Sequence, residues 1–295
     1  MASATPTEDD YRDRFRRVLA HIDAHLDDDL SLEALARVAA FSRFHFQRQF
    51  SALFGVSAHR YVQLVRMRRA SYQLVREDDA RILDVALDCG YQSHEAFSRA
   101  FKRVFGQTPS EFRGAPRWLS WHAIHQRLTT LRSTHMATTF TAADVELVDF
   151  PETRVAVVEH RGDPARVMGS VQRLVAWRRA RGLSPDRSAT FNIHYTDLHR
   201  TAPGAFRLDL AVATDQAIGA DDDVVEKTIP GGRCARLRVL GGDDAMEAGY
   251  RFLYGDWLPA SGHEPRDFPP FVQRVSFPPT VPAHEAVLDL FIPLT

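Results

Sequence analysis

The sequence predicts a multidomain chain, with an all-α N-terminal domain followed by an α+β domain of two pseudo-symmetric β-helix-β-β units. Three observations lead to this fold class. The chain has 295 residues, a length that is typical of about two domains. Apolar residues recur at helical spacing through the first third of the chain, whereas short runs typical of strands begin near residue 145. Two stretches of the helical part also repeat each other, which indicates one structural unit used twice.

Composition limits the class of protein. With 44% hydrophobic and 25% charged residues, the chain resembles an ordinary globular protein and can bury a sizeable core. The sequence has no run of about 18 apolar residues, which would predict a membrane-spanning helix. Its first residues also lack the apolar stretch of a secretory signal. We therefore expect a cytoplasmic protein with no membrane partner. Cys89 and Cys234 have no Cys or His at metal-ligand spacing, so we expect ordinary thiols, no metal site and no cofactor.

The all-α part is expected to hold six helices. Their apolar residues recur three and four positions apart, as in an amphipathic helix. The expected ranges are 14–26, 32–39, 42–54, 57–76, 82–88 and 93–105, followed by a last helical turn over 109–112. Ser31 stands where it would cap a helix at its start, and Gly55 and Gly106 follow two helices at the position where glycine ends them.

The two repeated stretches are residues 32–55 and 82–106. Their first helices match at an offset of 50 residues and their second helices at an offset of 51, so the extra residue falls in the turn. The matching pairs include Leu32 with Ile82, Ala36 with Ala86, Phe46 with Phe97, Phe50 with Phe101, Phe54 with Phe105 and Gly55 with Gly106. Each copy therefore reads as helix, tight turn and helix, with phenylalanines on the buried side of the second helix.

This layout is typical of a double helix-turn-helix, in which the second helix of each copy enters the major groove of double-stranded DNA. A linking helix of about 20 residues spans about 30 Å, and successive major grooves on one face of the duplex lie about 34 Å apart. Residues 37–113 also carry 13 Lys and Arg against 7 Asp and Glu, a balance that suits a polyanion. A plain helical bundle or helical repeat is the alternative, and the paired phenylalanine and glycine positions argue against it.

Residues 11–114 resemble the DNA-binding domain of the AraC/XylS family of transcription regulators. The matching segments are SLEALARVAAFS, FHFQRQFSALFG, ALDCGYQSHEAFSRAFKRVFG and GQTPSEFR. The resemblance implies a regulator, which we expect to be an activator, whose partners are promoter or operator DNA and RNA polymerase. Residues 115–143, rich in Thr, Ser, His and Arg, are expected to be a linker.

Exposed positions near the start of each second helix are expected to read bases. The candidates are Phe44, Gln47 and Arg48 in the first copy and His94, Glu95, Ser98 and Arg99 in the second. Phenylalanine can contact thymine methyl groups, while glutamine, arginine and glutamate can pair with adenine, guanine and cytosine. The candidates for phosphate contact are Arg43, Arg66, Lys102 and Arg103. Each of these side chains also has a plainer interpretation, as part of a hydrated helix face.

The second half reads as two successive cycles of strands around a helix. The first cycle has strands within 145–160, broken at Pro151, a helix at 167–181 and strands at 190–195 and 206–214. The second cycle has strands at 224–229 and 233–240, a helix at 243–258 and strands at 271–277 and 286–293. Such a repeat predicts a pseudo-twofold α+β domain over 144–295, with a groove between its halves suited to a small molecule.

This half resembles the gyrase-inhibitor-like effector-binding domain of multidrug-responsive regulators. The matching segments are EHRGDPARV, RLVAWRRARGL, FNIHYTDLHRTAPGAFRLDLAVAT, GGRCARLRVLG, YGDWLPASGHEPRDFPPF and DLFIPL. The resemblance implies an aromatic-lined site for lipophilic, often cationic effectors, which cation–π contact and a buried carboxylate hold. The candidate effector-binding residues are Glu159, Trp177, Phe191, Tyr195, Tyr254, Trp257 and Phe271. Val272 stands where many relatives carry Glu, so the charge of the effector stays open.

Two other functions stay open on the sequence. Some domains of this second type hydrolyse small electrophiles, and Glu159, His160 and Tyr195 could supply acid–base groups for a small-molecule hydrolase. The chain could also be a drug-binding protein whose helical half is an interaction module. Because no nucleophile elbow, metal cluster or phosphate loop is visible in the sequence, we predict that the chain is not an enzyme. Salt-dependent binding to duplex DNA separates a regulator from both alternatives.

Overall fold

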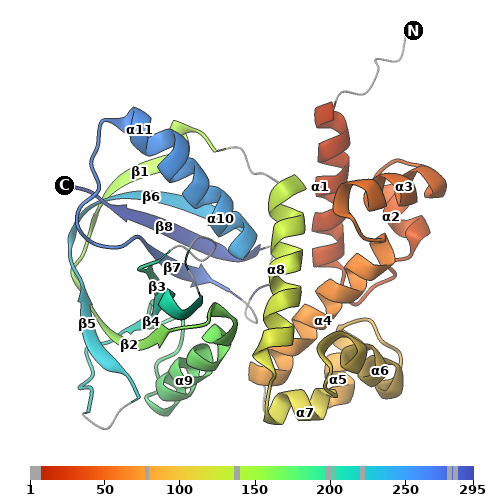
Figure 1. Cartoon of the computed structure of the whole chain (residues 1–295), viewed down its shortest axis with the longest axis horizontal. Coiled ribbons are helices and arrows are strands. Elements are labelled where there is room, and N and C mark those ends of the chain that lie inside the picture. Colours follow the sequence, from red (N-terminus) through yellow and green to blue (C-terminus); the bar gives the residue numbers. More distant parts are fainter. Residues whose placement is uncertain are drawn as a thin grey trace. The chain divides into compact units, whose positions relative to one another are not determined.

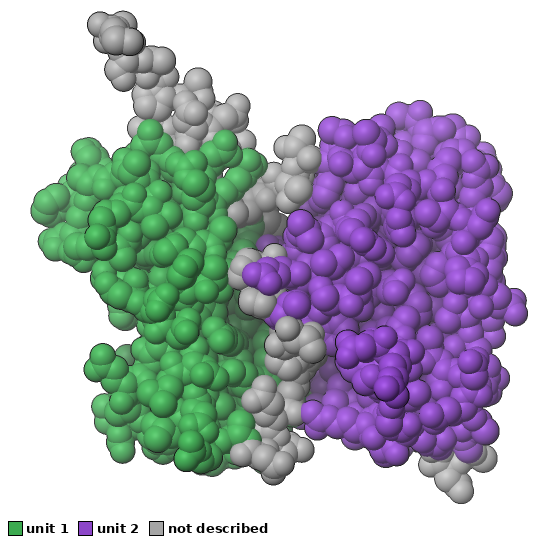
Figure 2. All heavy atoms as spheres, turned by 180° about the vertical axis from the view of Figure 1, so that it is seen from behind, with its two compact units in different colours: residues 1–137, 282–284 green, residues 138–281, 285–295 purple. Residues whose placement is uncertain are grey.

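The computed structural model describes residues 8–76, 80–135, 140–196, 201, 203–219, 223–277, 281 and 285–295. The chain divides into two compact units, one of residues 1–137 with 282–284 and one of residues 138–281 with 285–295 (Figure 2). The first unit is helical and the second is built on one sheet (Figure 1), which confirms the multidomain fold class. None of the helices in the described ranges is long and apolar enough to cross a membrane.

The helical unit holds the elements that the apolar spacing predicts. Its helices are α1 (Glu8–Ala24), α2 (Leu32–Val38), α3 (Arg43–Phe54), α4 (Ala58–Arg76), α5 (Ile82–Asp88), α6 (His94–Phe105), α7 (Pro109–Gly114) and α8 (Trp118–His135). In Figure 1, α2 and α3 lie at one end of α4, and α5 and α6 lie at the other. The pairs α2–α3 and α5–α6 are therefore the first and second helix-turn-helix motifs, and α4 is the helix that links them.

The two motifs share their local chemistry. α3 and α6 each have 12 residues. Ser42 and Ser93 cap them, because each hydroxyl accepts a hydrogen bond from the backbone N–H three residues later, at 3.3 and 3.2 Å. Gly55 and Gly106 end them with φ angles of 61° and 72°, a left-handed conformation that glycine adopts at little cost. The sequence repeat is therefore also a structural repeat.

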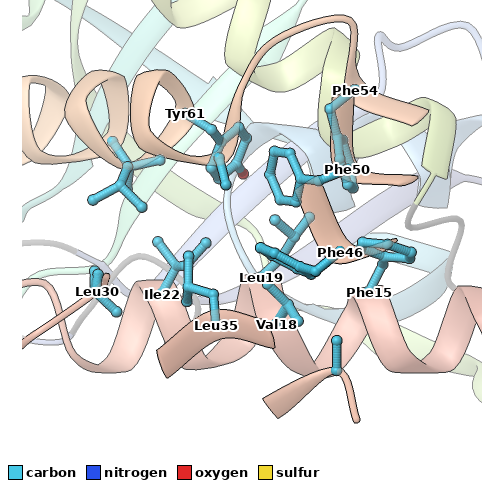
Figure 3. Packing of buried hydrophobic residues seen from close by; sticks show 14 of the residues in the cluster. Phe15, Val18, Leu19, Ile22, Leu30, Leu35, Phe46, Phe50, Phe54 and Tyr61 are labelled. Carbon is cyan, nitrogen blue, oxygen red and sulfur yellow. The ribbon is translucent and has the colours of Figure 1, made fainter. Parts of the chain in front are cut away.

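Three phenylalanines, one helical turn apart, anchor each second helix to a core. In α3 they are Phe46, Phe50 and Phe54, which are fully buried and pack with Phe15 of α1 and Tyr61 of α4 (Figure 3). The ring centroids of Phe46 and Phe50 lie 5.6 Å apart, within the range of favourable aromatic contacts. The equivalent buried residues of α6 are Phe97, Phe101 and Phe105. The buried side of both helices is therefore fixed by the same aromatic spacing.

The structure differs from the expected linker at residues 115–143, because Trp118–His135 form helix α8. α8 packs on elements of both motifs. The Trp118 ring lies 5.6 Å from the ring of Phe112 in α7, and Leu128 is fully buried in the core of the first motif. The composition concealed this helix, since Ser, Thr and His favour helices only weakly and tertiary packing overrides that weak preference.

A buried ion pair fastens the C-terminal part of α8. Arg132 Nη2 lies 2.6 Å from Asp23 Oδ2 of α1, and Arg132 Nη1 donates at 3.1 Å to both Asp23 Oδ1 and Tyr61 Oη. The two charged side chains are only 10% and 5% exposed. Because each charge has lost its water, each depends on the other for compensation. This pair therefore joins α1, α4 and α8.

The second unit is one antiparallel sheet with its helices. The strands are β1 (Val145–Phe150), β2 (Thr153–Arg161), β3 (Thr190–His194), β4 (Arg207–Ala213), β5 (Val225–Ile229), β6 (Gly232–Leu240), β7 (Phe271–Ser276) and β8 (Val287–Pro293), in the order β1-β6-β8-β7-β3-β4-β2-β5. The helices are α9 (Val167–Ala180) and α10 (Asp243–Phe252), which continues through a π-helical turn (Leu253–Trp257) into α11 (Leu258–Ser261). Short 3-10 turns occupy Ala142–Asp144, Pro164–Arg166 and Pro203–Ala205.

The sheet has the internal twofold symmetry that the two predicted cycles require. Exchanging β1–β2–α9–β3–β4 with β5–β6–α10–β7–β8 turns the strand order into its own reverse. β3 pairs with β7 at the centre, where Asn192 lies opposite Val272. Each half also lends its first strand to the other, since β1 pairs with β6 and β5 pairs with β2. The predicted pair of pseudo-symmetric units is confirmed, and the shared sheet makes them one domain.

The two faces of this sheet are buried in different ways, because successive side chains of a strand point to opposite faces. On one face, α9 packs against Leu208 and Leu210, and the α10 segment packs against Leu237 and Leu290. The opposite face carries a separate core, whose aromatic members are Phe150, Phe191, Phe271 and Phe291. The centre of the sheet on the helix side is therefore distinct from this aromatic core.

We predict that Asp23→Asn lowers the free energy of unfolding by about 3 kcal/mol, because it leaves Arg132 as a buried charge without its partner. Chemical denaturation of the full chain, followed by circular dichroism, measures this loss. Asp13→Asn is the matched control, since it removes the exposed partner of Arg16 and should leave stability unchanged. Equal and negligible effects of both variants would contradict the clamping role of the buried pair.

Candidate functional site

The exposed face of α3 carries the residues expected to read bases. Phe44, Gln47 and Arg48 are exposed between the buried phenylalanines. Phe44 is 71% exposed, so its ring is accessible to a partner from the first turn of α3. Arg43 lies over the Phe44 ring at 5.2 Å and pairs with Glu33 at 2.8 Å, so its guanidinium is held at the start of this face.

The matching face of α6 carries the second set. His94, Glu95 and Arg99 are exposed, and Ser98 is half-buried with its Oγ 3.4 Å from His94 Nε2. Arg99, like Arg48 in α3, forms no ion pair within the described ranges. Both guanidinium groups are therefore available to a ligand from equivalent places in the two motifs.

Glu95, the unexpected acid of this set, has a local structural role. Its own backbone N–H and the Ser93 hydroxyl hold the pKa of the Glu95 carboxyl below its usual value. A carboxylate in the first turn also interacts favourably with the positive end of the helix dipole. Helix capping therefore accounts for an acid here, whether or not it also meets cytosine.

The four residues expected to contact phosphate are not equivalent. Lys102 and Arg103 are exposed in the last turn of α6. Arg66 of α4 instead donates to the carbonyl oxygens of Leu26 and Asp28, at 2.8 and 2.9 Å, and burial lowers its pKa. A Cβ at Gly90 would lie only 2.4 Å from Arg66 Nη2, so this guanidinium also packs on the turn of the second motif. Arg66 is thus a structural tie between the α1–α2 loop and that turn.

The residues expected to line an effector site do not form one cluster. Phe191 and Phe271 lie in the aromatic core on the face away from α9 and α10. Trp177 packs between α9 and the sheet, and Trp257 packs in the α10 core. Glu159, Tyr195 and Tyr254 lie in two further clusters. Four of the seven candidates are therefore core residues, which no single ligand could reach without moving the core.

Glu159 and Tyr195 belong to a network that sequence reasoning missed. Lys227 Nζ lies 2.5 Å from both Glu159 Oε1 and Asp209 Oδ2, and Tyr195 donates to Asp209 Oδ2 at 3.1 Å. The bond from Lys227 lowers the pKa of Glu159. The ring nitrogens of His160 are instead engaged by Ser170 Oγ and the carbonyl oxygen of Asp163, so among the described residues His160 is not hydrogen-bonded to Glu159 or Tyr195, as the hydrolase alternative would need. The carboxylates are occupied by cations and held as a structural network.

Tyr254 belongs to a second cluster, at the centre of the sheet on the α10 side. Its ring lies 6.2 Å from that of Tyr250, which lies 5.9 Å from the ring of His194. His194 Nε2 and Tyr250 Oη are buried, and neither has a hydrogen-bond partner among the residues that the structure describes. Burial, assisted by the charge of Arg274, lowers the pKa of His194 to about 4, so this imidazole is neutral near pH 7. Two unsatisfied buried polar atoms are costly, which marks this cluster as a candidate ligand site.

The charged groups near the His194–Tyr250 cluster differ from those that the family resemblance implies. Val272, the residue that left the charge of the effector open, is fully buried in the α10 core. The nearby Arg274 pairs with Asp243 at 3.2 Å. Among the described residues of this cluster, no carboxylate is left to balance a cationic ligand. Tyr250, one turn before Tyr254, was the signal in the sequence that could have pointed here.

Comparison with known proteins identifies relatives of the second unit. Residues 143–295 match the family model of the GyrI-like small molecule binding domain. The probable transcriptional regulator YgiV of Escherichia coli (strain K12) is 33% identical over 153 residues, which cover 51% of this chain and 96% of that protein. The similarity thus extends over the whole sheet unit.

The helical unit has different relatives. Residues 35–115 match a helix-turn-helix domain model. The right origin-binding protein of Escherichia coli (strain K12) is 37% identical over 103 residues, or 35% of this chain and 35% of that protein. The regulatory protein SoxS of the same organism is 34% identical over 96 residues, which cover 32% of this chain and 89% of that protein. The two units are therefore similar to separate sets of proteins.

We predict that Arg66→Ala destabilises the helical unit by about 2 kcal/mol, because it removes charged hydrogen bonds to two backbone carbonyls. Thermal and urea denaturation of the full chain measure the loss. Arg103→Ala, which removes an exposed cation of α6, is the control and should leave stability unchanged. If Arg66→Ala instead keeps full stability and loses only DNA affinity, the residue is a phosphate contact after all.

Proposed function

This chain belongs to the GyrI-like small-molecule-binding family and carries an AraC-type helix-turn-helix DNA-binding domain, and on this premise we propose how it reads DNA and responds to a ligand. The chain is a DNA-binding transcription regulator. In our proposal residues 11–114 form the DNA-binding domain, α8 completes it, and residues 144–295 form the effector domain. YgiV and SoxS are named as regulatory proteins, so we also propose that the chain is not an enzyme. Turnover of nitrophenyl esters by the purified chain would contradict this.

α3 and α6 are proposed to enter successive major grooves on one face of the duplex. The observation that carries this proposal is the equivalence of the two motifs, each with an arginine, Arg48 or Arg99, on the exposed face that forms no ion pair with any described residue. Between them α4 has 19 residues, which corresponds to about 28 Å of helix and is close to the roughly 34 Å between successive major grooves. One chain would thus read two half-sites without dimerising.

Activation and the contact with RNA polymerase are proposals of the same kind. Leu83 and Leu87 of α5 are 44% and 50% exposed and lie one turn apart, an apolar pair that a protein partner could cover. Transcription in vitro with purified polymerase tests both proposals, since an activator raises the transcript level and a repressor lowers it.

The effector is proposed to be a flat, lipophilic and neutral molecule with a hydrogen-bonding group. His194 Nε2 and Tyr250 Oη would bind that group, because both are buried without a hydrogen-bond partner in the described part of the chain and belong to rings that meet edge to face at 5.9 Å. Val272 contributes no charge, and Arg274 disfavours a cation nearby. The preference for cations implied by the resemblance is therefore not carried over to this chain.

The effector domain is proposed to act on the DNA-binding domain through α8. Residues 136–139 separate the last residue of α8 from Phe140, which packs against Phe252 of α10 at 5.7 Å. α10 also carries Tyr250 of the candidate ligand site. A ligand that shifts α10 would therefore change the position of the chain leading to α8, which packs on both motifs.

We predict that Arg48→Ala and Arg99→Ala each weaken specific binding by about 1–3 kcal/mol, because each removes a guanidinium that can pair with guanine. Gel-shift titration at fixed salt, on a duplex selected from a random library, measures the loss. Arg187→Ala, an exposed arginine of the other unit, is the control. Unchanged affinity together with unchanged sequence preference would reject the assignment, and binding without salt dependence would reject DNA binding by these faces.

We predict that 4-phenylphenol binds the full chain at least tenfold more tightly than 4-biphenyl-trimethylammonium, since the two share an aromatic body and differ in the polar group. Isothermal titration calorimetry measures both affinities. Tyr250→Phe removes only the hydroxyl and should reduce the preference for the phenol over unsubstituted biphenyl. Equal or tighter binding of the ammonium compound would show that the effector is cationic after all.

We predict that a five-residue Gly-Ser insertion between residues 137 and 138 separates ligand binding from DNA binding. The ligand and the duplex should each bind as before, but the ligand should no longer change DNA affinity, an effect expected to be about 5–150-fold in the unmodified chain. The same five residues appended after Thr295 are the control. If the ligand still changes DNA affinity across the insertion, the two domains communicate by another route.

A further inference from the structure

The second unit contains a hollow that lies apart from the His194–Tyr250 cluster. Its volume is about 460 Å³, and it is lined by Glu159, His160, Arg161, Asp163, Arg166, Gly169, Ser170 and Arg173. These residues come from the end of β2, the following 3-10 turn and the first half of α9. The volume falls within the range of small-molecule sites, so the hollow can take a ligand of a few to a dozen heavy atoms.

The charged groups around this hollow leave a positive excess. Both carboxylate oxygens of Glu159 are occupied, one by Lys227 and the other by Arg161. Arg166 and Arg173 are exposed, and in the described ranges neither forms an ion pair. The lining therefore keeps a net positive charge, because Arg166 and Arg173 are set against one remaining carboxylate, that of Asp163, whose Oδ1 accepts a hydrogen bond from the backbone N–H of Ala165.

A buried polar scaffold holds Arg173 in place. His160 and Ser170 are each only 5% exposed. His160 Nε2 lies 3.1 Å from the carbonyl oxygen of Asp163, which can only accept, so Nε2 carries the proton and Nδ1 accepts from Ser170 Oγ at 2.9 Å. Ser170 Oγ in turn accepts from Arg173 Nη2 at 3.2 Å. Burying a histidine and a serine to orient an exposed arginine is costly, which points to a use for that arginine.

Gly169 keeps the space in front of this scaffold open. A Cβ added at this position would meet no other atom within 4 Å, so any side chain here would project into free space beside Ser170. Its place inside α9 does not require glycine, because its backbone is in the ordinary helical region. The glycine at position 169 therefore keeps the hollow accessible, and the backbone conformation does not require it.

We propose that this hollow is a binding site for a small dianion, a phosphate ester or a dicarboxylate, which Arg166 and Arg173 hold through paired N–H donors. Guanidinium groups match both oxyanion geometries, and the neutral His160 adds no charge of its own. The site lies in the half of the domain opposite α10, and it requires neither the proposed effector nor DNA.

The test uses the full chain with three probes at constant ionic strength: phenyl phosphate, malonate and sodium chloride. Calorimetry measures affinity, and the amide resonances of Gly169 and Ser170 report the location. The variants are Arg166→Ala combined with Arg173→Ala, Gly169→Glu, which places a carboxylate in the hollow and favours the helix, and the control Arg187→Ala.

We expect either dianion to bind saturably and to shift the amide resonances of Gly169 and Ser170. The affinity should fall at least tenfold in both hollow variants and stay unchanged in the control. Binding of phenyl phosphate alone identifies a phosphate ester, binding of malonate alone identifies a dicarboxylate, and either supports the site. Shifts that sodium chloride reproduces, or dianion binding that both hollow variants retain, would overturn the proposal.

Discussion

The structure of the helical unit depends on the burial of three phenylalanines, four residues apart, in α3 and again in α6. Because Phe46, Phe50 and Phe54 point into the core, the residues between them, such as Gln47 and Arg48, are held on the opposite side. Each fully buried phenylalanine contributes about 1.5–3 kcal/mol, so rotation of the helix about its own axis is strongly disfavoured. The aromatic core therefore sets which side chains a DNA groove can meet, and the polar face follows from it.

Two motifs on one chain can bind one duplex together only if the distance between them is fixed. Buried polar contacts hold the helices of the first unit rigidly in place. Arg132 of α8 joins α1 and α4 through Asp23 and Tyr61, while Arg66 ties the α1–α2 loop to the turn of the second motif. The effector domain uses a different means, because each half lends its first strand to the other half's sheet edge. The internal symmetry then brings β3 and β7 together at the centre of the sheet. The side chains there are not symmetric, since Asn192 of β3 lies opposite Val272 of β7.

Local sequence pattern was sufficient to predict most of the fold and the exposed residues of α3 and α6 that we propose to face DNA. Helix spacing, serine caps, glycine ends and the offset repeat are all short-range signals, and the structure has the corresponding elements. The features that sequence reasoning missed depend on distant partners: Arg132 meets Asp23 across 109 residues, and Lys227 meets Asp209 only through strand pairing. For the same reason the aromatic candidates Phe191 and Phe271 could not be separated from core residues, while His194 gave no pattern of its own and Tyr250 gave only its spacing of one turn from Tyr254. The periodicity of apolar residues predicts which face of a helix is buried. A site built from several strands also requires the pairing register of those strands, which the sequence does not give.

Hydroxyl-radical footprinting of the purified chain on a selected duplex tests the central claim, that one chain places two equivalent helices in successive major grooves. We expect two protected patches on one face of the duplex, about 10 base pairs apart, at a stoichiometry of one chain per duplex. A single protected patch, or two patches that appear only when two chains are bound, would contradict it.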